Sequence, residues 1–276
     1  MDNPVTNLDA PILEFDGEPQ AIIEPSKQIT PLATMPRCGV ITFFQDVIDH
    51  FVERGLAHEM FALRSEMGRH PLYLHEYQGT QLVLFHPGVG APLAAAILEE
   101  AIALGCRNFI ACGGAGVLDR ELALGHLVIP SAAVRDEGTS YHYLPPSRDA
   151  HPDPDAVAAI EQVLSARNVD YVVGKTWTTD AIYRETRQRM AARRAEGCIT
   201  VEMEAAALFA VARFRGVKLG QILYCGDNLD GEEWDSRAWQ EHWGVREILV
   251  ELAAEAAVRL GNSTAQPTQP PAHGTE

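Results

Sequence analysis

The chain has few basic residues, and this scarcity excludes one class of partner. Its 276 residues contain 22 Lys and Arg against 38 Asp and Glu, which gives a formal net charge of −16. Binding to a nucleic-acid backbone needs clustered positive side chains, so we predict no nucleic-acid partner. A small anion remains compatible with this charge, because a few local hydrogen-bond donors can hold one against a distant negative field.

The sequence also lacks long apolar runs, a leader segment and a cysteine motif. No window approaches the roughly 20 apolar residues of a membrane-spanning helix, and the first residues, Met1-Asp2-Asn3-Pro4, do not resemble a secretion signal. We therefore expect a cytoplasmic protein with no membrane partner. Without zinc or redox spacing we expect no metal, no cofactor and reduced core thiols. These thiols belong to Cys38, Cys106, Cys112, Cys198 and Cys225.

Between two polar ends, strand-like and helix-like segments alternate. Residues 1–34 are rich in Pro, Asp and Gln and predict an extended arm, and residues 261–276 predict a disordered tail. Residues 35–260 contain no linker-like stretch, so we expect one domain there. The expected strands are 38–44, 72–77, 81–86, 108–112, 126–130, 171–177 and 219–225, and the expected helices are 45–57, 91–104, 154–167, 202–214 and 238–260. This alternation predicts an α/β fold, a three-layer α/β/α sandwich around a mixed sheet.

Two glycine-rich segments follow expected strands and are interpreted as turns. They read Gly88-Val89-Gly90 and Gly113-Gly114-Ala115-Gly116. Backbone amides in such turns can cradle an anion, and the alternative is that glycine serves turn geometry alone. A dinucleotide site is disfavoured, because the third glycine and the long crossover helix of that fingerprint are missing.

Three acidic residues stand in apolar surroundings. Glu202 and Glu204 flank Met203 at the start of an apolar helical run, where carboxylates need polar partners, water or exposure. Asp227 follows the expected strand 219–225, which suggests a site at the carboxyl edge of the sheet. The ordinary alternatives are acids that favour a helix N-terminus capped by Thr200, and an Asp in a turn-rich loop.

Taken in order, these motifs resemble the nucleoside phosphorylase and nucleosidase superfamily, over residues 38 to 230. The matching segments are Gly88–Gly90, Gly113–Gly116, Gly125–Pro130, Thr178–Asp180, Val201–Ala206 and Gly226–Asp227. The resemblance implies that residues 35–260 form a catalytic domain with a partly barrel-like sheet, assembled as a homodimer or a ring of dimers. It also implies cleavage of an N-ribosidic bond through a transition state with oxocarbenium character.

The resemblance assigns roles to several residues. It implies that Glu204 accepts hydrogen bonds from the ribose hydroxyls, that Met203 packs against the sugar, and that Asp227 protonates or hydrogen-bonds the leaving base. An acid at position 227 favours a purine or purine-like nucleoside. Glu202 is expected to support the site. Further substrate contacts are expected from Gly113, Gly114, Tyr183, Arg184 and His142, although the ring of Tyr183 would lend little specificity and a loop histidine is often only solvated.

The residues that bind phosphate in phosphorolytic members are replaced. Their Pro-Gly-Asp-Pro-x-Arg-like loop corresponds here to residues 21–27, and their arginine and hydroxyl at the glycine cluster correspond to Ala111 and Gly114. Losing these groups removes most charge-assisted donors for phosphate. Candidates for an anion or water site are Gly88, Lys27, Arg64, Arg69 and Asp46. Asp46 is the candidate for the general base that activates water, and Glu24 is a second candidate for this role.

Three alternatives stay open. Hydrolysis is preferred, because the donors for phosphate are replaced. Phosphorolysis would require a remodelled anion site, with inorganic phosphate as second substrate. A nucleoside-binding or storage protein is the third, because membership of a superfamily does not guarantee turnover; retention of both Glu204 and Asp227 counts against it.

Overall fold

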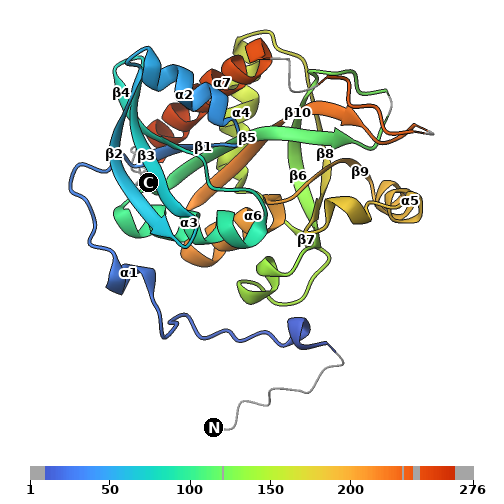
Figure 1. Ribbon diagram of the computed structural model, residues 1–276, viewed down its shortest axis with the longest axis horizontal. Helices are drawn as coiled ribbons and strands as arrows, with labels where there is room; N and C mark the ends of the chain where they lie inside the picture. The colour runs from blue at the N-terminus through green and yellow to red at the C-terminus, as the bar shows by residue number, and fades with distance from the viewer. Residues whose placement is uncertain (1–9, 120, 232, 239–242, 265–276) are drawn as a thin grey trace, which may run out of the picture.

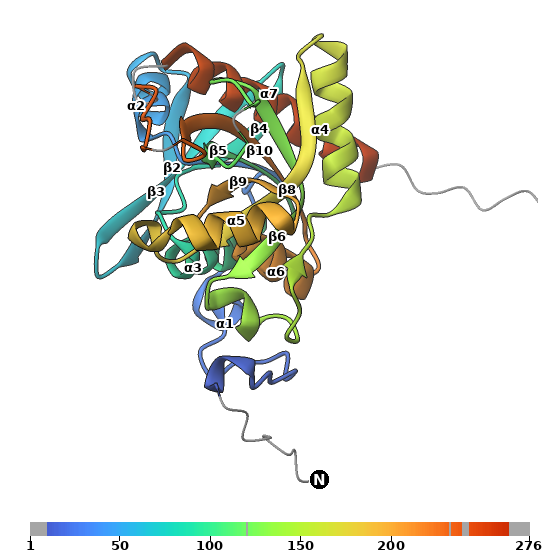
Figure 2. The same cartoon turned by 90° about the vertical axis from the view of Figure 1, so that its right-hand side faces the viewer.

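The computed structural model describes residues 10–119, 121–231, 233–238 and 243–264, which form one mixed sheet between two helical layers (Figures 1 and 2). Four neighbouring strands of the sheet are parallel and run in the order β4-β1-β5-β10. They are β1 (Cys38–Thr42), β4 (Thr80–Phe85), β5 (Asn108–Val117) and β10 (Lys218–Asn228). Beyond β4, the antiparallel strands β3 (Gly68–Tyr77) and β2 (Ala57–Ser65) extend the sheet.

On the other side the sheet curls into a closed barrel of five strands. β10 pairs with β5 and with β6 (Leu127–Asp136), and β6 continues through β8 (Tyr171–Thr179) and β9 (Cys198–Glu202) back to β5. The short β7 (Asp149–Ala150) pairs with β6. Closure removes the free edges of these strands. The expected α/β sandwich with a mixed, partly barrel-like sheet is confirmed.

Helices cover both faces of the sheet, and each layer buries its own apolar cluster (Figure 1). One layer contains α2 (Gln45–Glu53), α4 (Pro154–Ala166) and α7 (Trp243–Thr264). The opposite layer contains α3 (Ala91–Leu104) and α6 (Ala205–Arg215), with α1 (Pro25–Gln28) packed on α3. α5 (Arg187–Ala195) lies beside β9, and the 3-10 turns are η1 (Pro11–Leu13), η2 (Thr139–His142) and η3 (Ile182–Arg184). All five cysteines are buried.

Some expected boundaries are wrong, and each error has a local cause. The helix expected over 45–57 ends at Glu53, and β2 was missed because only Ala57 and Leu63 of its nine residues are buried. The helix expected from Glu202 begins at Ala205, and Glu202 instead ends β9. The last helix continues to Thr264, four residues beyond the expected end at 260. Residues 265–276 of the expected tail and 1–9 of the expected arm lie outside the described residues.

The described part of the N-terminal arm is tied to the helical layer by a buried ion-pair triad. Arg215 on α6 donates from Nη1 to Glu24 Oε1 at 2.8 Å and from Nε to Glu99 Oε2 at 2.7 Å. Glu24 and Glu99 are both buried, and the backbone amide of Leu32 donates to the carbonyl of Leu104 at 3.0 Å. The arm is therefore part of the folded unit from Glu24 onward. No helix among the residues that the structure describes is long and apolar enough to cross a membrane.

Replacing Arg215 by Met should lower the free energy of unfolding by ~3 kcal/mol, because two buried carboxylates lose their shared cation. Chemical denaturation measures this loss. Arg213→Met on the same helix is the matched control, since Arg213 is exposed and should change stability little. Equal stability of the two variants would show that the triad does not hold the arm.

Candidate active site

The candidate site lies at the carboxyl edge shared by the four parallel strands. Asp227 is near the end of β10, and the loops after β1 and β4 begin with Phe43 and His86. Gly116 of β5 stands between the two acidic segments, because a Cβ atom placed there would lie 3.0 Å from Val201 Cγ1 on β9 and 3.6 Å from Asp227 Oδ1. The same glycine is therefore flanked by β9, the strand that leads to Glu204, and by the carboxylate of Asp227.

Glu204 occupies the N-cap position of α6 and is only 5% exposed. Its Oε1 accepts a hydrogen bond of 2.6 Å from the backbone amide of Gly90. Gly90 has φ of 91° and is itself the N-cap of α3, a backbone conformation that favours glycine. The motif Gly88–Gly90 and the motif Val201–Ala206 are thus joined directly, with half-buried Met203 beside them.

Glu202 lies at the end of β9 and is held from three directions. Its Oε2 accepts from the amides of Glu204 at 2.7 Å and Ala205 at 2.6 Å, and its Oε1 accepts from Thr178 Oγ1 at 2.6 Å. The Thr178 hydroxyl in turn accepts from the amide of Ala206 at 3.0 Å. Glu202 therefore faces the N-terminus of α6, where the helix dipole favours negative charge.

Burial raises the pKa of both Glu202 and Glu204, because a charged carboxylate loses hydration there. The charge of Glu202 raises the pKa of Glu204 further, and Asp180 adds to the same effect. Backbone and hydroxyl hydrogen bonds to Glu202 act in the opposite direction. The two acids form one electrostatically coupled pair.

Asp227 is half-buried and accepts a hydrogen bond at Oδ2 from Trp234 Nε1 at 2.7 Å. Beside this bond lies a surface hollow of about 160 Å³. It is lined by Glu185, Arg187, Met190, Leu229, Gly231, Glu233 and Trp234. Burial and then the nearby Asp227 raise the pKa of Glu185 to about 7. Sequence analysis missed Glu185 and Trp234, which carry no motif.

Three expected substrate residues are exposed, unlike the buried pair Glu202 and Glu204. The side chain of Tyr183 on η3 is 95% exposed, and Arg184 beside it is exposed as well. His142 on η2 is also exposed. Their loops are nevertheless close, since the amide of Gly138 donates to Asp180 Oδ2 at 2.9 Å. The structure brings the two loops together and leaves these three side chains exposed.

The glycine cluster does not form the expected turn. Gly113 and Gly114 lie inside β5, opposite Leu223 and Tyr224 of β10. A Cβ atom on Gly113 would lie 2.9 Å from the ring of Phe43, and one on Gly114 would lie 3.1 Å from the ring of Tyr224. These glycines therefore allow aromatic rings to pack against the strand.

The loop expected to replace the phosphate loop was also misplaced. Residues 21–27 precede β1, and the loop that follows β1 begins at Phe43. His86 joins this loop to the next one, because its Nδ1 accepts from the amide of Gly88 at 2.9 Å and its ring packs edge-on against Phe43. Gly88, with φ of 84°, therefore shapes a turn beside Glu204.

The expected cations and the expected base lie on different elements of the fold. Lys27 is exposed on α1, and Arg64 and Arg69 are exposed opposite each other on β2 and β3, where Arg69 pairs with Glu59. Asp46 on α2 forms an ion pair of 2.7 Å with the buried Arg246 of α7. Sequence analysis missed Arg246. This residue contacts Asp46 from α7, 200 residues further along the chain.

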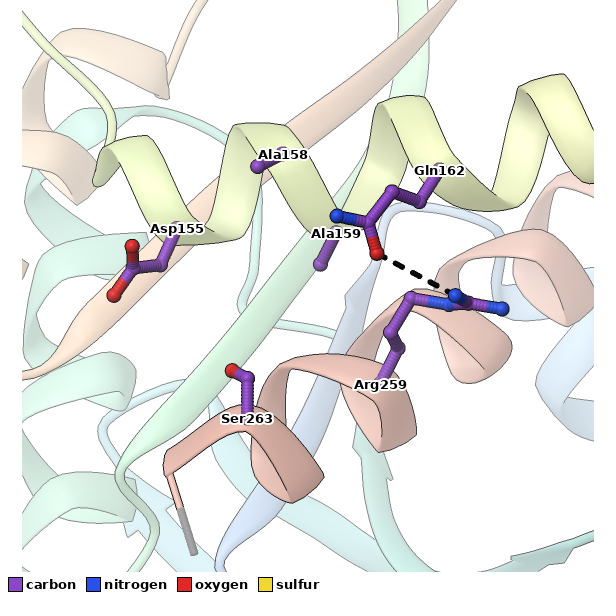
Figure 3. Close-up of a pocket in the computed structure, with 6 residues that line it drawn as sticks. All are labelled: Asp155, Ala158, Ala159, Gln162, Arg259 and Ser263. Carbon is purple, nitrogen blue, oxygen red and sulfur yellow. Dashed lines mark hydrogen bonds between the residues drawn. The ribbon is translucent and has the colours of Figure 1, made fainter. Parts of the chain in front are cut away.

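A larger cavity, of about 240 Å³, lies elsewhere, between α4 and α7 (Figure 3). Its lining includes Asp155, Gln162, Arg259 and Ser263, and Arg259 donates to Gln162 across it at 3.4 Å. None of the candidate residues contributes to it. Within the described ranges, no three His, Cys, Asp or Glu side chains are grouped so as to hold a metal ion.

Comparison with known proteins agrees with this architecture. A guanosine phosphorylase of Halorubrum lacusprofundi is 33% identical over 153 residues, which cover 55% of this chain and 64% of that protein, slightly less than two thirds. A DeoD-type purine nucleoside phosphorylase of Dichelobacter nodosus is 28% identical over 82% of this chain and 92% of its own length.

Solved structures show the same fold. An AMP nucleosidase from Bacteroides thetaiotaomicron has a TM-score of 0.69 at 23% identity, over 84% of this chain and 91% of that one. A uridine phosphorylase from Vibrio fischeri has a TM-score of 0.70 at 24% identity, over 86% and 98%. The phosphorylase superfamily matches residues 37–260. The chain therefore belongs to the phosphorylase superfamily, the nucleoside phosphorylase and nucleosidase group that its motifs resemble.

Proposed function

We propose that this chain is an enzyme that cleaves the N-ribosidic bond of a purine or purine-like nucleoside and transfers the ribosyl group to water. The observation that carries the proposal is that Val201, on the strand that leads to Glu204, and the carboxylate of Asp227 both lie against Gly116 at one edge of the sheet. A nucleoside has a diol at one end and a basic heterocycle at the other, so two separated carboxyl groups match its two polar ends.

At the sugar end, Glu204 would accept hydrogen bonds from the ribose hydroxyls. One lone pair of Oε1 is engaged by Gly90, which fixes the carboxylate and leaves the remaining lone pairs for the diol. Charge-assisted bonds of this kind are about twice as strong as neutral ones. Met203, which is half-buried beside Glu204, would cover the apolar face of the sugar.

At the base end, Asp227 would donate a proton or a hydrogen bond to the departing heterocycle. The bond from Trp234 to Oδ2 restrains the rotation of the carboxyl group, and Oδ1 lies toward Gly116. The reaction needs such help because the bond breaks with positive charge on the sugar and electrons on the base. A positioned acid typically contributes 10²- to 10⁴-fold in rate.

Water is the proposed acceptor because the glycine cluster offers little to an anion. The Phe43 ring packs against Gly113, and Ala111 and Gly114 carry no donor side chain. Asp46, which lies just after β1 at the same edge, is the proposed base that activates the water. Tyr183, Arg184 and His142, on two loops joined by the bond from Gly138 to Asp180, are the further substrate contacts in this proposal.

Phosphorolysis is the second candidate, favoured by the relatives named guanosine, purine nucleoside and uridine phosphorylases. Lys27, together with Arg64 or Arg69 contributed by a neighbouring subunit of a homodimer or a ring of dimers, would then form the anion site. In either case we expect the enzyme to act on free nucleosides in the cytoplasm, without a cofactor.

A panel of purine and pyrimidine nucleosides, assayed with and without inorganic phosphate, separates the candidates. We expect purine release in both conditions, with free ribose as the sugar product. Ribose 1-phosphate and strict dependence on phosphate would overturn the hydrolytic proposal. Binding of nucleosides without any release of base would instead identify a binding protein.

Glu204→Ala should lower kcat/KM by at least about 10²-fold, because charge-assisted contacts that position the reacting sugar are lost. The fold should persist, as judged by circular dichroism, because Glu204 lies at a helix end and not within the helix. Glu161→Ala on α4, in the opposite helical layer, is the control and should retain activity. Comparable activity in the two variants would remove Glu204 from the sugar site.

Asp227→Asn should depress kcat for purine nucleosides by roughly 10²-fold while changing ribose affinity little, because only proton donation to the base is lost. Steady-state kinetics with a purine nucleoside and inhibition by free ribose separate the two effects. Asp170→Asn, at the amino end of β8, is the matched control. A wild-type kcat in Asp227→Asn would contradict the acid role.

A further inference from the structure

We propose that Glu202 is a positioning residue that fixes the turn carrying Glu204 and, through its negative charge, sets the pH at which Glu204 can accept the ribose hydroxyls. The inference rests on the proposed function for the role of Glu204. Glu202 itself needs no contact with substrate, since its oxygens are already occupied by Thr178 and by the amides of Glu204 and Ala205.

Apart from the bonds to Glu202, few hydrogen bonds hold the turn between β9 and α6. Glu204 is not capped by its own side chain, which points to Gly90 instead. The amides of Glu204 and Ala205 would therefore lack a partner without the Glu202 carboxylate, and unpaired buried amides are costly. Because Thr178 on β8 donates to the same carboxylate and accepts from Ala206, the strand, the turn and the helix form one connected unit.

The charged side chains that act most strongly on Glu202 and Glu204 are negative. Asp180 follows β8 and raises the pKa of Glu204, and Glu137 follows β6 and raises the pKa of Glu202. Within the described ranges no Lys or Arg forms a salt bridge with Glu202 or Glu204. Backbone amides, the Thr178 hydroxyl and the N-terminus of α6 are thus the groups that offset the charge of the pair.

Two adjacent buried carboxylates do not both ionise readily, so the pair retains a proton at a pH where single acids have lost theirs. Glu202 receives hydrogen bonds from two amides and the Thr178 hydroxyl and stabilises its charge better than Glu204, which receives backbone hydrogen bonds from Gly90 and Met203. The retained proton therefore resides on Glu204. It must leave before Glu204 can accept from both hydroxyls, so the kcat/KM profile should rise with pH through this ionisation.

Two substitutions of Glu202 separate geometry from charge. Glu202→Gln keeps an oxygen for the two amides but removes the charge, so we expect a modest loss of maximal kcat/KM, about tenfold, and a shift of the rising limb to lower pH. Glu202→Ala leaves the amides unpaired and frees the turn, so we expect a loss of roughly 10²-fold, as for a misplaced catalytic group. Glu99→Gln, another buried glutamate but one paired with Arg215, is the control whose rising limb should not shift.

Direct titration of the Glu204 carboxyl by carbon-13 NMR reads the same effect without substrate. It should show a lower pKa for Glu204 in Glu202→Gln than in the wild type and no change in Glu99→Gln. An unchanged Glu204 titration, or wild-type kcat/KM in Glu202→Ala, would overturn the inference. If the wild type released no base, the proposed function would fail while the NMR comparison still decided the coupling.

Discussion

Placing two carboxylates almost out of solvent, two residues apart, is the constraint on which the rest of the structure depends. Glu202 and Glu204 have no salt bridge to a cation in the described parts of the chain, so main-chain amides must supply the hydrogen bonds that water no longer provides. This requires a strand that ends where a helix begins, a hydroxyl from the adjacent strand and a glycine-rich turn that aims its amide at the site. β9, α6, Thr178 and Gly90 meet those needs together.

The closed barrel explains why these parts come from distant segments. β9 lies between β8, to which it is parallel, and β5, to which it is antiparallel. Its last residue, Glu202, therefore pairs with Thr178, and Val201 pairs with Gly116. β10 follows the other edge of β5 and ends at the same height, which puts Asp227 on the far side of Gly116. A larger side chain at 116 would meet Val201 and Leu229, so the close approach of the two acidic segments depends on glycine there.

The sequence predicts the architecture well, because alternating apolar strands and helices and ordered motifs are long-range signals, and the expected helix over 91–104 matches α3. It predicts the acids at positions 202, 204 and 227 but not their setting. In the sequence, the five residues of β9 resemble the start of the next helix. They form a strand because β8 and β5 pair with them. The glycine cluster likewise looks like a turn, although its glycines make room for Phe43 and Tyr224. Arg246, Glu185 and Trp234 carry no motif, and only tertiary packing brings them to the site.

The most direct test of this account is a crystal structure of the protein with a non-cleavable purine nucleoside analogue. The account predicts one analogue at the carboxyl edge of β5 and β10, with its ribose hydroxyls within about 3 Å of Glu204 and its base beside Asp227. An analogue seated elsewhere, for example between α4 and α7, or one whose ribose does not contact Glu204, would contradict it.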